Sequence, residues 1–130
     1  MVVIAVPSNG DGGLSEMMNS RFGRCPSFTL VTVENGEIIA VKTVPNPGQR
    51  DMGSAGIHAA EIIGSNNSNV LIAGLIGPNA AKTLEPLNVK VFHAPDQNKT
   101  IKQIIEQYVQ GELEELKGPN IGAQKGGYDD

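Results

Sequence analysis

Three short runs constrain the fold more than any other feature of the sequence: two are wholly apolar, at residues 2–6 and 70–73, and the third, at 89–92, is apolar except for Lys90. Each is too short to be a helix and is rich in β-branched residues, which favours a strand. Continuous apolar strands are typical of parallel sheets that are covered on both faces, and parallel strands need long crossover connections, usually helices. The runs therefore predict an α/β fold.

Two further β-rich runs, at 28–34 and 37–44, are joined by Asn35-Gly36, which is the strongest short signal for a β-hairpin. Helices are predicted at 55–63, from Pro78 onward, and at 101–109, where Thr100 and Gln103 can form a capping box. Together these elements predict a mixed five-stranded sheet flanked by helices. The carboxyl ends of parallel strands meet at one edge, where open sheets bind ligands. The loops expected there are 8–26, 45–53, 74–78 and 93–98.

Composition excludes several classes of protein. The 130 residues predict one domain, and a single cysteine cannot form a disulfide within the chain or supply a four-cysteine metal site. A net charge of −4 argues against nonspecific binding to nucleic acid. The amino-terminal segment lacks the features of a signal peptide, and no apolar run is long enough to span a bilayer. We therefore expect a cytoplasmic protein that binds neither nucleic acid nor membrane.

The glycine-rich segment GDGGLS at 10–15 nearly matches a dinucleotide-binding fingerprint, and Glu34 stands about where a ribose-binding acid would be expected. The segment after it, however, would break the required helix, and the next element is a hairpin strand. A flexible glycine loop is therefore the preferred interpretation. The common motifs of serine hydrolases, zinc proteases and P-loop nucleotidases are absent.

The string Arg21-Phe22-Gly23-Arg24-Cys25-Pro26 is the most specific in the chain. Arginine binds anions through a planar fork of donors, and a cysteine beside two cations gains thiolate character, so the string can bind an anion or a metal. The structural alternative is equally open: two solvated arginines, a core phenylalanine and a small buried cysteine. His93 and His58 could each ligate a metal or be structural. Helix starts at Ser54 and at Gly77-Pro78-Asn79 offer free N–H groups to anions.

Taken together, these segments resemble the dinitrogenase iron–molybdenum cofactor biosynthesis family, which includes NifX, NafY and the C-terminal part of NifB. The resemblance covers residues 1–116 and leaves 117–130 as a flexible glycine-rich tail; the charged and glycine-rich composition already favours a tail from Leu113 onward. It is carried by VVIAVPS at 2–8, RFGRCPSF at 21–28, Asn46-Pro47, SAGIHAAEII at 54–63, AGLIGPNA at 73–80 and GELEEL at 111–116.

The resemblance implies a three-layer ribonuclease H-like fold with strand order 3-2-1-4-5 and an antiparallel second strand. It also implies non-catalytic binding or carrying of an anionic iron–sulfur or iron–molybdenum-type cluster, in a monomer or weak dimer that works with cluster-assembly proteins. A related type of protein carries a molybdenum–copper sulfide cluster. The residues expected to contact the cluster are Arg21, Phe22, Gly23, Arg24, Asn46, Ser54, Gly77 and Asn79, with Cys25, His93 and His58 as metal ligands.

Two other functions compete with this one. The first is a metal-free regulatory or scaffold module that binds a protein partner through the same loop edge. The second is a binder of a small anion or nucleotide that uses the glycine loops.

Overall fold

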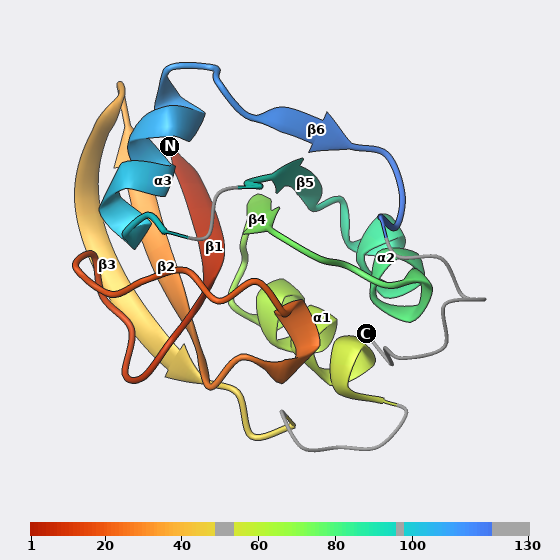
Figure 1. Ribbon diagram of the computed structural model, residues 1–130. Helices are drawn as coiled ribbons and strands as arrows, with labels where there is room; N and C mark the ends of the chain where they lie inside the picture. The colour runs from red at the N-terminus through yellow and green to blue at the C-terminus, as the bar shows by residue number, and fades with distance from the viewer. Residues whose placement is uncertain (49–53, 96–97, 121–130) are drawn as a thin grey trace.

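The computed structural model describes residues 1–48, 54–95 and 98–120, and these form a mixed α/β fold (Figure 1). The mixed α/β class predicted from the sequence is confirmed. The elements are β1 (Val2–Ser8), η1 (Phe22–Arg24), β2 (Ser27–Glu34), β3 (Glu37–Pro45), α1 (Ala55–Ser65), β4 (Val70–Ala73), α2 (Pro78–Leu84), η2 (Glu85–Leu87), β5 (Lys90–His93), α3 (Ile101–Val109) and β6 (Glu114–Leu116). No helix in these ranges is long and apolar enough to cross a membrane.

Within the described residues the sheet has six strands, in the order β3-β2-β1-β4-β5-β6. Strand β1 pairs antiparallel with β2 and parallel with β4, and β5 is parallel to β4. The prediction of five strands was wrong, because β6 adds to the outer edge of β5 in the antiparallel direction. Leu116 of β6 packs against the core. The prediction of a flexible tail from Leu113 onward, which rested on composition, was therefore wrong for the residues of β6.

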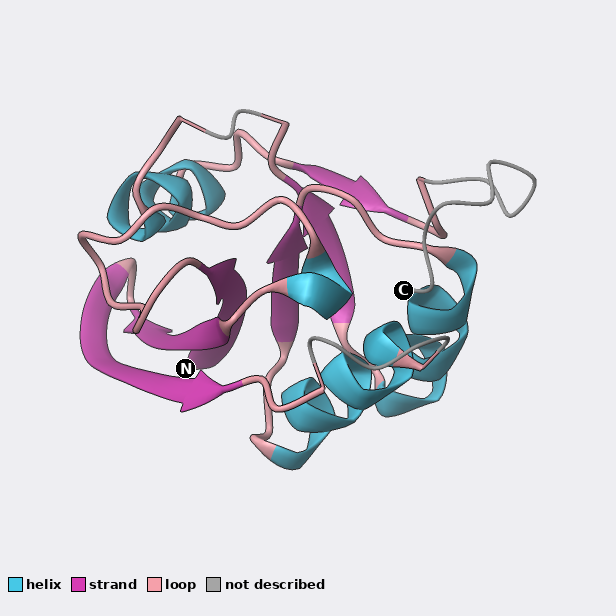
Figure 2. Ribbon diagram, turned by 60° about the horizontal axis from the view of Figure 1, so that its bottom comes forward, coloured by secondary structure: helices cyan, strands magenta, loops and turns pink. Residues whose placement is uncertain are grey.

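The sheet is covered on both faces (Figures 1 and 2). One core lies under α1, α2 and η1, and the other lies under α3. Strand β1 contributes to both, since Ala5 packs in the first core while Ile4 and Val6 pack in the second. This alternation is why β1 reads as a continuous apolar run rather than as an apolar–polar alternation.

The β2–β3 hairpin turns at Asn35 and Gly36, whose φ angles of 53° and 79° are both positive, as the tightest hairpin turns require. Because β3 is antiparallel to β2, it runs in the same direction as β1, β4 and β5. The carboxyl ends of these four strands, at Ser8, Pro45, Ala73 and His93, therefore face one edge of the sheet. The loops that follow them carry most of the residues singled out in the sequence.

Residue 117 onward was predicted to be a flexible tail. Positions 121–130 lie outside the described residues, and so do Arg50 and residues 96–97. Before that point, Asn120 is hydrogen-bonded to the loop between β4 and α2. The division into a domain at 1–116 and a tail stays a prediction.

Candidate site at the loop edge of the sheet

The arginine loop, defined here as residues 21–25, is built around a buried aromatic side chain. Phe22 is fully buried and its ring centroid lies 5.6 Å from that of Phe28 on β2. The turn is closed by a hydrogen bond of 3.2 Å from the backbone N–H of Arg24 to the carbonyl oxygen of Arg21. With Phe22 and Gly23 inside the core, Arg21 remains exposed and Arg24 partly exposed at the loop edge. Phe22 thus anchors a loop that has an exposed arginine before it in the sequence and a partly exposed one after it.

Cys25 lies at the bottom of this loop and not at its surface. Its side chain is 0% exposed, and the thiol donates to the carbonyl oxygen of Phe22 at 3.2 Å. In this conformation the sulfur is inside the core that contains Phe22 and Phe28. A metal could reach it only if the turn at 22–24 opened.

Asn46, predicted as a cluster contact, fastens the arginine loop from behind. Its Nδ2 donates to the carbonyl oxygen of Cys25 at 2.8 Å and to that of Gly23 at 3.2 Å, and it lies 3.9 Å from the sulfur of Cys25. Its backbone N–H donates to the carbonyl oxygen of Pro26 at 3.0 Å. The side chain is 1% exposed, and its Oδ1 has no hydrogen-bond partner in the described ranges. Asn46 therefore shapes the loop from the interior.

The two histidines occupy different elements. His93 ends β5, is half-buried, and pairs with Ala73 on β4 and Glu114 on β6. Strand alternation places it on the same face as Val91, which packs against the core under α1 and α2. His58 is exposed on α1 and lines a shallow cavity of about 500 Å³ with Pro47 and Glu61.

Across the three described stretches of chain, no three His, Cys, Asp or Glu side chains lie together in a way that would hold a metal ion. Cys25, His93 and His58 therefore do not form a preassembled ligand set, and their roles as metal ligands stay predictions.

The two helix starts differ in accessibility. Ser54 precedes α1 without a capping hydrogen bond from its side chain, and it is partly exposed. Gly77, which precedes α2, is buried, whereas Asn79 in the first turn of α2 is exposed. Ser54 and Asn79 are thus at least partly open to solvent and Gly77 is not, and the roles of all three as cluster contacts stay predictions.

The glycine loop at 10–13 is anchored to the sheet by hydroxyl groups. The Oγ atoms of Ser8 and Ser27 are 2.7 Å apart, and the hydroxyl of Thr29 donates to that of Ser8 and accepts from the N–H of Gly13, both at 3.0 Å. Among the described residues before 55 no α-helix begins, so the loop is not followed by the helix that a dinucleotide fingerprint requires. This geometry agrees with the preferred interpretation of GDGGLS as a loop, although hydroxyl contacts hold it in place.

One contact of the site has almost no signal in the sequence. The backbone N–H of Leu75 donates to the carbonyl oxygen of Ser20 at 2.8 Å, and Arg21 forms a bridge with Leu75. A Cβ on Gly74 would lie 3.1 Å from the oxygen of Ser20, so the glycine permits this close approach. The start of the arginine loop is thus in contact with the loop between β4 and α2. In the sequence, the glycine at position 74 is the signal that could have pointed to this contact.

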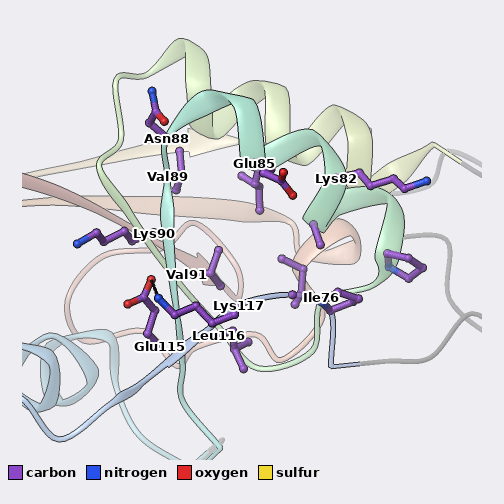
Figure 3. Close-up of a pocket in the computed structure, with 15 residues that line it drawn as sticks. Ile76, Lys82, Glu85, Asn88, Val89, Lys90, Val91, Glu115, Leu116 and Lys117 are labelled. Atoms are coloured by element: carbon purple, nitrogen blue, oxygen red, sulfur yellow. Dashed lines mark ion pairs between the residues drawn. The ribbon is translucent and has the colours of Figure 1, made fainter.

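A separate groove lies between α2 and the β5–β6 edge (Figure 3). It has a volume of about 560 Å³ and a largely aliphatic floor that includes Leu84, Val91 and Leu116. Lys117 on its rim pairs with Glu115 at 3.3 Å. The residues that line the groove include no histidine or cysteine, so it offers none of the ligands expected for a metal cluster.

The sequence of residues 1–111 matches the model of the dinitrogenase iron–molybdenum cofactor family. The chain belongs to this family. The match spans the arginine loop, both histidines and the four loops at the edge of the sheet, and it ends before β6. Family membership connects the chain with the binding or biosynthesis of iron–molybdenum cofactor.

Two solved structures and one relative found by its sequence support the same assignment. The apo form of the orange protein from Desulfovibrio gigas is 30% identical, with a TM-score of 0.85, and the alignment covers 93% of this chain and 98% of that one. A candidate NifB protein from Thermotoga is also 30% identical, with a TM-score of 0.75 and the same coverage. The uncharacterized protein MJ0580 of Methanocaldococcus jannaschii is 30% identical over 77% of this chain and 83% of its own length.

Proposed function

We propose that this protein binds and carries an anionic iron–sulfur or molybdenum-type cluster, without catalysing a reaction, in the assembly or delivery of a cofactor. One observation carries the proposal: a buried aromatic side chain lies between an exposed Arg21 and a partly exposed Arg24, at the edge of the sheet where four loops meet. Membership of an iron–molybdenum cofactor family supports a metal–sulfide cluster as the anion that we propose for this edge.

The donors at this edge fit a cluster that is held by charge and hydrogen bonds. Guanidinium groups are always protonated and present several N–H donors, which suit the sulfide or oxide surface of an anionic cluster. Soft ligands are less available in this conformation, because the thiol of Cys25 is buried. We therefore expect Arg21 and Arg24 to supply most of the affinity, His93 to serve as an accessible auxiliary ligand, and Cys25 to ligate metal only if the arginine loop opens. The other parts of the proposal are a cytoplasmic location, a monomer or weak dimer, and cluster-assembly proteins as partners.

The proposal is tested with tetrathiomolybdate, a molybdenum–sulfur dianion, added under anaerobic conditions to the apo protein. The double variant Arg21→Ala/Arg24→Ala should bind this probe at least about tenfold more weakly, as expected when two charge-assisted contacts are lost. The double variant Lys42→Ala/Lys82→Ala removes the same charge from exposed positions on β3 and α2, and it should bind within about twofold of wild type. Binding is followed by visible absorption, with metal and sulfide analysis of the product.

Two further comparisons separate the contributions. Molybdate, which has the same charge but oxygen in place of sulfur, measures how much affinity is charge alone. Cys25→Ser should retain binding if the thiol stays buried and should change the absorption bands if the thiol ligates metal. If the wild-type protein took up neither tetrathiomolybdate nor a supplied iron–sulfur cluster, cluster carriage would be wrong and the scaffold function would replace it.

A further inference from the structure

Asn120 makes three hydrogen bonds with the loop between β4 and α2. Its Oδ1 accepts from the N–H of Ile76 at 2.7 Å, its Nδ2 donates to the carbonyl oxygen of Gly74 at 2.7 Å, and its backbone N–H donates to the carbonyl oxygen of Ile76 at 3.0 Å. One asparagine thus pairs with three backbone groups of a segment more than forty residues earlier in the chain. It does so from beyond the part of the chain that matches the family.

The opposite side of the same loop carries the start of the arginine loop. The N–H of Leu75 donates to the carbonyl oxygen of Ser20, and a Cβ added at Gly74 would lie only 3.1 Å from that oxygen, a tight contact. Residues 74–76 therefore lie between Asn120 on one side and residues 20–21 on the other, as a central strand lies between two neighbours. Ile76, which is 1% exposed, fixes the inner side of the segment in the core.

Strand β6 places Asn120 at this position. Leu116 pairs with Val91 of β5 and packs against the core, and Pro119 limits the backbone freedom of the residues that lead to Asn120. The segment from β6 to Asn120 acts as a strap whose end fastens the loop at 74–76. Without Asn120, two of the loop's carbonyl groups and one N–H would lose these partners, and the loop would keep only its contacts with residues 20–21 and the packing of Ile76 in the core.

We propose that Asn120 is a positioning residue for the arginine loop: it holds residues 74–76 in the conformation on which Ser20 and Arg21 rest. The consequence for cluster affinity rests on the proposed function, whereas the mechanical link between Asn120 and Ser20 does not. Asn120 itself needs no contact with the cluster. Its contribution is to keep the guanidinium group of Arg21 in one place before binding.

Two amides report on the link separately in hydrogen exchange of the apo protein. The N–H of Ile76 is bonded to Asn120 itself, and the N–H of Leu75 is bonded to Ser20 on the far side. In Asn120→Ala we expect exchange at Ile76 to rise about tenfold, as for the loss of one hydrogen bond, and exchange at Leu75 to rise by at least about threefold. Lys117→Ala, a change at an exposed residue of the same strap, should alter neither rate.

Affinity for tetrathiomolybdate is measured on the same variants. Asn120→Ala should weaken binding by about threefold to tenfold, which is less than the effect of Arg21→Ala/Arg24→Ala. The Asn120 variant loses the fixed position of the loop but keeps both arginine charges. Asn120→Asp should weaken it to a similar extent, since a carboxylate can accept from Ile76 but cannot donate to Gly74.

Each contrary result has a distinct meaning. Unchanged exchange at Ile76 in Asn120→Ala would show that the strap does not hold the loop. Faster exchange at Ile76 with unchanged exchange at Leu75 and unchanged binding would show that the effect stops at the loop, which overturns the positioning role. If the arginine double variant bound the probe as well as wild type, the proposed function would fail, but exchange at Leu75 would still decide the link from Asn120 to Ser20.

Discussion

At the scale of single residues, Asn46 is the side chain that is hydrogen-bonded to the loop covering the thiol of Cys25. It donates to two carbonyl groups of the arginine loop from a position that is 1% exposed. We predict that Asn46→Ala lowers the free energy of unfolding by about 1–3 kcal/mol, because those buried carbonyl groups lose a donor. It should also raise the rate at which a thiol reagent modifies Cys25, since the turn that covers the sulfur loses its fastening.

The matched comparison is Asn46→Asp, which has nearly the same shape but sets a carboxylate against two carbonyl oxygens. It should destabilise the protein more than alanine does. Unfolding in urea and the kinetics of thiol labelling measure the two effects. Equal labelling rates in wild type and Asn46→Ala would show that something other than Asn46 keeps the thiol covered.

At the scale of the element, the N-terminus of α3 is hydrogen-bonded both to its own capping residues and to the long loop that precedes η1. Thr100 and Gln103 form a reciprocal capping box, with bonds of 3.2 Å and 2.9 Å. The first free N–H groups of the helix, on Ile101 and Lys102, donate to the carbonyl oxygens of Glu16 and Leu14. The start of α3 is therefore held by its own cap and by the loop, and the loop is held in return.

We predict that Thr100→Ala costs about 0.5–2 kcal/mol of stability, the usual effect of removing an N-terminal cap. Thr83→Ala on α2 is the control, because its hydroxyl only donates back to the carbonyl oxygen of Asn79 within the helix; the change should stay within about 0.5 kcal/mol. Thermal and urea unfolding of both variants give the comparison. Equal losses in the two variants would mean that the box contributes no more than an ordinary exposed threonine.

At the scale of the whole molecule, Gly74 and Ser20 bring together segments that are far apart in the sequence. A Cβ at Gly74 would lie 3.1 Å and 3.2 Å from backbone atoms of Ser20, which cannot move aside as a flexible side chain could. We predict that Gly74→Ala costs about 1–3 kcal/mol, typical of overpacking, and that it speeds exchange at the amide of Leu75. Gly118→Ala is the matched control, since nothing lies within 4 Å of its Cβ position. A neutral Gly74→Ala would show that the backbone of Ser20 can make the small shift that a Cβ needs, and that the contact is not tight enough to cost stability.

Much of the fold could be predicted from local patterns. The turn at Asn35-Gly36 and the Thr100–Gln103 box form through interactions between residues that are close in sequence. The short apolar runs mark strands by their local pattern, although those strands pair with partners far away in the chain. Strand β6 could not be predicted in this way. Its three residues are Glu114, Glu115 and Leu116, and the strand exists because the edge of β5 offers unpaired backbone groups and the core accepts Leu116.

The candidate site divides along the same line. Sequence patterns singled out the arginine loop and the edge where it lies, because arginines around an aromatic residue and the ends of parallel strands have recognisable spacing. Tertiary structure alone decided that Cys25 points into the core, that Asn46 fastens its loop, and that Asn120 holds the segment on which Ser20 rests. The physical reason is that these hydrogen bonds are made to backbone groups, which every residue carries. The type of the partner residue therefore gives no signal in the sequence, and the partner is known only once the chain has folded.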